Sequence, residues 1–163
     1  MQLWRRRGRL PDNARAQLGL SPGERVLAAG RQVDGRWLVG TDQALVGEGL
    51  RVPWVDVAHA QWLPSEQVLV LDPVPGAFGT IQVRLEEPGR LPETVHERVM
   101  ASIVVTTRVA VPGAGGVRIV GRRGVDGPLV WQVVPDAGVD LAADDVRSAA
   151  EETVQRLRAE LNQ

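Results

Sequence analysis

No cysteine, lysine or tyrosine occurs in the 163 residues, and phenylalanine occurs once. Without cysteine, the chain forms no disulfide and offers no thiolate for metal binding or nucleophilic catalysis. Without lysine, it has neither a Schiff-base residue nor a Walker A loop, whose lysine contacts the phosphates of a nucleotide. All 19 basic residues are arginine, a bias that we attribute to a GC-rich genome. These absences exclude several large classes of enzyme.

The remaining composition is that of an ordinary globular protein. Apolar residues make up 44% and charged residues 24% of the chain, and the net charge is -1, so bulk charge selects no partner. A chain of this length buries roughly 70% of its unfolded surface, enough for a core without a metal or cofactor. No apolar run reaches the roughly 20 residues that cross a bilayer, and no apolar signal segment follows the N-terminal arginines. We therefore expect a cytoplasmic protein.

The first half of the sequence predicts one short helix and then short strands. The helix is expected over Pro11–Leu18, where proline suits the first turn. Arg25–Arg31 and Arg36–Thr41 flank an Asp34-Gly35 pair, which favours a hairpin turn with positive φ at both residues. Pro53 restricts its strand to a sheet edge or a bulge. Apolar runs predict five further strands at Ala44–Val46, Leu50–Trp54, Val57–Leu63, Gln67–Leu71 and Phe78–Leu85.

In the second half, the spacing of the apolar residues changes twice, from helical to strand-like and back. Val95 and Val99 lie four residues apart within Pro92–Ile103, which predicts an amphipathic helix. Three β-like runs then predict an antiparallel meander at Val104–Val111, Val117–Arg123 and Leu129–Val134. A last helix is expected over Leu141–Leu161, with Asp140 or Asp144 as its N-terminal cap. Its apolar face is predicted to consist of Val146, Ala149, Ala150, Val154, Leu157 and Leu161.

These elements predict an α+β fold that is mostly antiparallel β. With GERVL before the first strand, WLVGTDQALV as a second hairpin and VPWVDV before the next strand, residues 24–103 resemble the bacterial pleckstrin-homology-like family. The resemblance implies a small barrel or sandwich with an amphipathic helix, and a binding or scaffolding module without catalysis. We expect a basic arm and short helix in 1–19, the PH-like domain in 20–105, and the meander with its C-terminal helix in 106–163, packed on that domain.

Side chains that carry chemistry are few and scattered. His59 and His96 are the only histidines, and without cysteine a zinc site needs carboxylates as further ligands. Four aspartates near the last helix, Asp136, Asp140, Asp144 and Asp145, lack EF-hand spacing, so we assign them to capping rather than to calcium. The serines stand in no GxSxG setting, and a Ser-His-Asp triad assembled in space stays open. We predict no catalytic residue, no cofactor, no metal and no small-molecule ligand.

Two features predict an interaction surface. The N-terminal arm combines one indole with several guanidinium groups. The indole suits a nucleic-acid base or a membrane interface, and the guanidinium groups suit phosphates. The residues are Trp4, Arg5, Arg6, Arg7 and Arg9. The other feature is a set of tryptophans in strands, where a large ring usually fills the core and an exposed ring marks a contact surface. Trp54, beside Pro53 on the expected edge strand, fits either role.

We therefore expect a non-catalytic binding or scaffold protein. Its partner is expected to be another protein, or a second copy of the chain, held through an edge strand or a tryptophan-bearing face. The alternative is an accessory protein that binds nucleic acid or an anionic membrane through its arm. The salt dependence of binding distinguishes the two hypotheses, because contacts between arginine and phosphate weaken as ionic strength rises.

Overall fold

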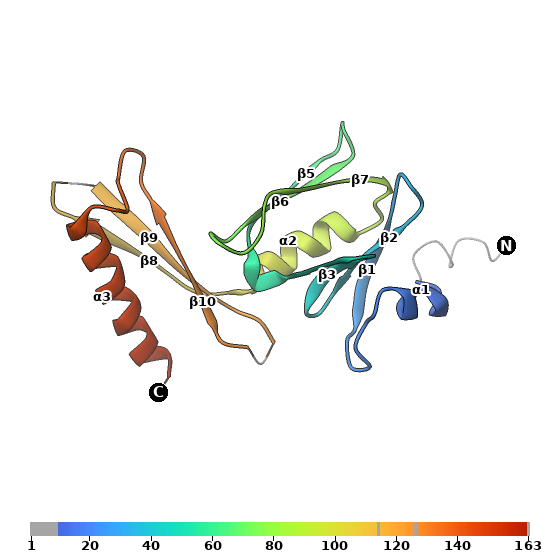
Figure 1. Cartoon of the computed structure of the whole chain (residues 1–163), viewed down its shortest axis with the longest axis horizontal. Helices are drawn as coiled ribbons and strands as arrows, with labels where there is room; N and C mark the ends of the chain where they lie inside the picture. The colour runs from blue at the N-terminus through green and yellow to red at the C-terminus, as the bar shows by residue number, and fades with distance from the viewer. Residues whose placement is uncertain (1–9, 114, 126, 163) are drawn as a thin grey trace. The chain divides into compact units, whose positions relative to one another are not determined.

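The computed structural model describes residues 10–113, 115–125 and 127–162, and the chain divides into two compact units (Figure 1). Unit 1 runs to Ser102 and includes a short piece around Gly124, whereas unit 2 comprises Ile103–Arg123 and the chain from Gly127 onward. Unit 1 holds a seven-stranded sheet, and unit 2 holds a three-stranded sheet and the last helix. The predicted α+β fold with mostly antiparallel strands is confirmed.

The sheet of unit 1 has the order β4-β3-β2-β1-β7-β6-β5, with antiparallel neighbours throughout. The order ends at β4 and at β5, so these two are the edge strands, as predicted for the strand that contains Pro53. A 3₁₀ turn, η1 (Trp54–Asp56), joins them along the chain. The strands are β1 (Val26–Gln32), β2 (Trp37–Thr41), β3 (Ala44–Gly47), β4 (Leu50–Pro53), β5 (Val57–Leu63), β6 (Val68–Pro73) and β7 (Ile81–Glu87).

The first hairpin turn differs from its prediction in one residue. Gly35 adopts the left-handed conformation, at φ 84°, but Asp34 does not. The Gln32 amide donates to the Arg36 carbonyl at 2.8 Å, so the connection has three residues, a length that places the glycine last. Asp34 instead accepts a hydrogen bond from the Arg36 side chain at 2.7 Å, and this bond lowers the pKa of the exposed carboxyl.

Helix α2 (Leu91–Ala101) supplies the apolar face that completes the core of unit 1. Leu91, Val95 and Val99 are buried, and Figure 1 shows the helix running between β5 on one side and β1 and β2 on the other, all of which it contacts. A Cβ atom on Gly30 would lie 3.2 Å from the Leu91 side chain, and one on Gly40 would lie 3.3 Å from it. These two glycines therefore let the helix approach the sheet closely.

The predicted first helix is α1 (Asp12–Gln17), which packs on unit 1 rather than standing apart from it. Ala14 and the preceding Leu10 are buried in a cluster with Val39, Ala44 and Val46. The described chain is thus anchored at its first residue.

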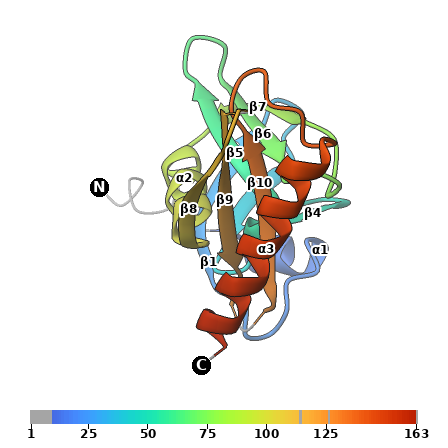
Figure 2. The same cartoon turned by 90° about the vertical axis from the view of Figure 1, so that its left-hand side faces the viewer.

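Unit 2 consists of an antiparallel meander and one helix. Strands β8 (Ile103–Val111), β9 (Gly115–Arg123) and β10 (Leu129–Pro135) have the order β10-β9-β8. Helix α3 (Asp144–Leu161) crosses one face of this sheet (Figure 2). Val146, Ala150 and Leu157 of the helix are buried in one cluster with Val117 and Ile119 of β9. Both the meander and the packing of the helix were predicted.

The predicted cap of α3 is wrong. Ala143 stands at the cap position, with no hydrogen bond from a capping side chain. Asp144 is already the first residue of the helix, where its carboxylate pairs with Arg147 at 2.8 Å, and Asp140 lies in the preceding turn, where it accepts from the Ala142 amide at 2.9 Å. The α3 helix therefore begins later than its apolar pattern suggested. None of the described helices is long and apolar enough to span a membrane.

Candidate functional site

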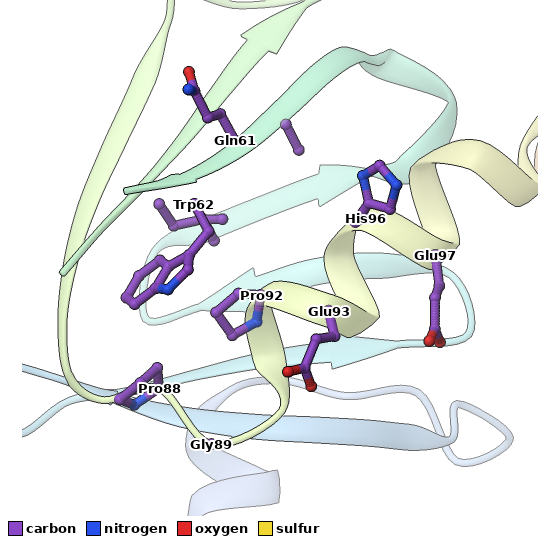
Figure 3. Close-up of a pocket in the computed structure, with 10 residues that line it drawn as sticks. Gln61, Trp62, Pro88, Gly89, Pro92, Glu93, His96 and Glu97 are labelled. Carbon is purple, nitrogen blue, oxygen red and sulfur yellow. The ribbon is translucent and has the colours of Figure 1, made fainter. Parts of the chain in front are cut away.

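A groove of about 470 Å³ lies between strand β5 and helix α2, within unit 1 (Figure 3). We call it the β5–α2 groove. Residues 60–62 form its strand side, Leu69 and residues 88–89 line it further, and the helix contributes Pro92, Glu93, His96 and Glu97. Its volume falls within the range of small ligand sites, but it is an open groove rather than a closed cavity.

The strand side of the groove belongs to the edge of the sheet. β5 pairs with β6 from Val57 to Leu63, with an irregularity between Val57 and His59, and it is the last strand of the order. In an edge strand, every second residue directs its backbone N–H and C=O groups away from the paired neighbour. The groove therefore places hydrogen-bonding backbone beside the helix.

Trp62 gives the groove an apolar end. Its ring is half-buried and packs against the core cluster of unit 1, while in Figure 3 it lies together with the rings of Pro88 and Pro92. Gln61, the neighbouring residue, is exposed and points away from these rings. An indole beside two prolines is an apolar surface that suits an aliphatic, aromatic or guanidinium group.

The helix gives the groove an acidic side. Glu93 and Glu97 lie one turn apart on the exposed face of α2, opposite the buried Leu91, Val95 and Val99, and His96 stands between them in sequence. Arg90, just before the helix, reaches Glu93 at 3.5 Å, but both side chains are largely exposed, so the pair is weak. The described lining thus holds two carboxylates and one imidazole.

The candidate residues from the sequence lie elsewhere. Trp54 is 4% exposed in the core, and its indole N–H donates to the Thr41 carbonyl at 2.8 Å. Of the two roles that the sequence allowed for Trp54, this placement is the core role, because both its ring and its N–H have partners inside the unit. The arm residues Trp4, Arg5, Arg6, Arg7 and Arg9 lie outside the described residues.

Sequence reasoning did not assign the residues of the β5–α2 groove to a binding site. His96 was weighed only as a zinc ligand, and Trp62 is one of the tryptophans in strands, which fit either the core or a contact surface. Glu93, His96 and Glu97 do carry a signal, since their i, i+3, i+4 spacing defines the polar face of the predicted helix. What the sequence did not show is that this face borders an edge strand.

The buried carboxylate of Glu24 is a second site that the sequence did not indicate. It is 2% exposed and accepts hydrogen bonds from the Thr41 hydroxyl at 2.6 Å and the Ser21 amide at 3.1 Å, and it pairs with Arg51 at 3.0 Å. Burial acts to raise the pKa of Glu24, but the hydrogen bonds from Arg51, Thr41 and Ser21 together outweigh it and lower the pKa. These donors all belong to the chain, so we assign Glu24 to structure.

The histidines and aspartates that the sequence analysis weighed as metal ligands do not come together in the part of the chain that the structure describes. Among the described residues, no group of three or more histidine, aspartate or glutamate side chains is placed to hold a metal ion. His59 lies 3.6 Å from Asp72, and both side chains are exposed. Asp136 accepts from the Gly116 amide at 3.1 Å and pairs with Arg108.

Comparison of the chain with protein-family models, with curated proteins and with solved structures gives no match. The site therefore has to be interpreted from its own geometry.

Proposed function

We propose that the protein is a non-catalytic binding module that holds an extended segment of a protein partner in the β5–α2 groove. One observation carries the proposal: an edge strand and the polar face of a helix border the same groove, with a half-buried tryptophan at one end. An extended segment can add to an edge strand through backbone hydrogen bonds, while pockets beside the strand select its side chains. The pleckstrin-homology-like resemblance stays a prediction.

The proposal is tested by selecting binders from a displayed library of random linear peptides with the full chain as the target. We expect selected peptides to slow amide hydrogen exchange at residues 60–62 of β5, because a bound segment pairs with the part of the edge strand that borders the groove. Trp62→Ala should weaken binding about tenfold or more, the usual loss when a central aromatic contact is truncated.

Trp37→Ala is the matched control, since Trp37 is a half-buried tryptophan of the same unit that lies on β2, away from the groove. Thermal melts of both variants establish that they fold. Peptides that bind the Trp62 variant as tightly as the parent, or that protect other strands, would contradict the proposal. Polyanion binding through the arm stays a prediction.

A further inference from the structure

The β5–α2 groove and the N-terminal arm carry opposite charges. Glu93 and Glu97 are the acidic residues of the described lining, and none of its residues is arginine. Arg90, beside the groove, pairs with Glu93 at 3.5 Å, but both side chains are largely exposed. The arm, MQLWRRRGR, holds four arginines and no acidic residue. Complementary charges of this kind favour association and fix the register of a bound segment.

The two also share a division into an apolar and a charged part. In the groove, the rings of Trp62, Pro88 and Pro92 lie at one end, and His96 and Glu97 lie further along the helix (Figure 3). In the arm, Leu3 and Trp4 come before Arg5, Arg6 and Arg7. An extended arm therefore offers apolar side chains to the tryptophan end and guanidinium groups to the carboxylates in one orientation.

The arm is tethered to the unit that contains the groove. Leu10, the residue that follows it, is 8% exposed and packs in the α1 cluster of unit 1. Nine extended residues span at most about 30 Å. A short tether that reaches the groove would give an effective concentration there on the order of millimolar.

We propose that residues 1–9 occupy the β5–α2 groove and compete there with the partner's segment. The proposal rests on the proposed function, because the groove must first accept an extended segment. It identifies the preferred ligand as an arginine-rich segment with an apolar residue before the arginines.

The test measures the binding of a fluorescein-labelled MQLWRRRGR peptide by fluorescence anisotropy. Two full-length proteins are compared: the parent, and an arm variant in which Trp4, Arg5, Arg6, Arg7 and Arg9 are all replaced by glutamine. We expect the arm variant to bind the peptide at least about tenfold more tightly, because its groove is no longer occupied by its own arm.

Adding Glu93→Gln and Glu97→Gln to the arm variant should weaken peptide binding about fivefold, the size expected for two exposed ion pairs. Glu48→Gln with Glu66→Gln is the matched control, because these exposed carboxylates lie in turns outside the groove. Raising the salt from about 50 to about 300 mM should also weaken binding.

The inference would be overturned if the parent and the arm variant bound the peptide equally well. It would also be overturned if Glu93→Gln and Glu97→Gln left the affinity for the peptide unchanged. If library-selected peptides occupy the groove but the arm peptide does not bind, the inference fails and the proposed function stands. If the library-selected peptides bind outside the groove, the inference and the proposed function both fail.

Discussion

In unit 1 and in unit 2, one amphipathic helix packs on antiparallel strands, but the two units cover the apolar face of that helix to different degrees. In unit 1, α2 contacts β1, β2, β5 and η1, so elements from separate parts of the sheet share its apolar face. In unit 2, α3 contacts mainly β8 and β9 and covers one face of three strands. The core of unit 2 therefore depends on fewer side chains, and each of them should matter more.

The grooves beside the two helices differ as well. In unit 2, a groove of about 370 Å³ lies between β10 and α3, and its charged residues are Arg147, Glu151 and Arg158. Its charges are thus mixed, whereas those of the β5–α2 groove are acidic. A helix beside an edge strand is common to both units, but only the β5–α2 groove adds a tryptophan and a single sign of charge.

The largest effect is expected from Leu157→Ala in unit 2. Leu157 is 8% exposed, and truncating a buried leucine typically costs about 2 to 5 kcal/mol. The free energy of unfolding, measured by denaturant titration, should fall by that amount. Leu161→Ala, at the half-exposed last residue of α3, is the control and should cost less. Unfolding curves of Leu157→Ala that match the parent would show that α3 is not part of the stability of unit 2.

In unit 1, Glu24→Gln should lower stability by about 1 to 3 kcal/mol near neutral pH, because it weakens a buried, hydrogen-bonded carboxylate. The pKa of Glu24 is lowered on folding, so the charged group stabilises the protein above its ordinary pKa of 4.5, and this stabilisation is lost as the pH falls through the lowered value. The difference between parent and variant should therefore shrink on acidification below about pH 4.5. Denaturant titrations at several pH values measure it, and a difference that grows in acid would contradict the assignment.

An effect of similar size is expected where unit 2 packs a ring onto a glycine. A Cβ on Gly121 would lie 2.8 Å from the Val105 side chain and 3.0 Å from the Trp131 ring. Gly121→Ala should therefore cost about 1 to 3 kcal/mol by overpacking, read from thermal melts. At Gly79, in unit 1, a Cβ would meet nothing within 4 Å, so Gly79→Ala should leave stability unchanged or slightly raised. Equal melting temperatures for the two variants would mean that unit 2 adjusts to the added methyl group.

Local patterns predicted the elements of both units well. Val95 and Val99 placed α2, and the apolar positions from Val146 to Leu157 placed α3, because a helix with one buried face must repeat apolar residues every three to four positions. Boundaries were less predictable. Asp144 has the chemistry of a cap, but the helix includes it, and capping depends on backbone angles that residue type only biases.

The candidate site was harder to predict because it joins distant segments. Trp54 and Trp62 are both strand-like tryptophans in the sequence, yet one is hydrogen-bonded in the core and the other borders the groove. The difference arises because β5, which carries Trp62, is an edge strand of the sheet, and α2 packs beside it. Likewise, Glu24 acquires its partners Thr41 and Arg51 only when β2 and β4 fold beside it.

The half-buried ring of Trp62 allows binding in the groove to be followed by tryptophan fluorescence. Indole emission shifts to shorter wavelength when water is displaced from the ring, and Trp62 is the tryptophan that lines the β5–α2 groove. Trp54, already enclosed and hydrogen-bonded, contributes a constant background within unit 1. With Trp4 replaced by phenylalanine in both proteins, subtracting the spectrum of a Trp62→Phe protein would isolate the emission of Trp62, so the molecule contains an optical sensor of what enters the groove.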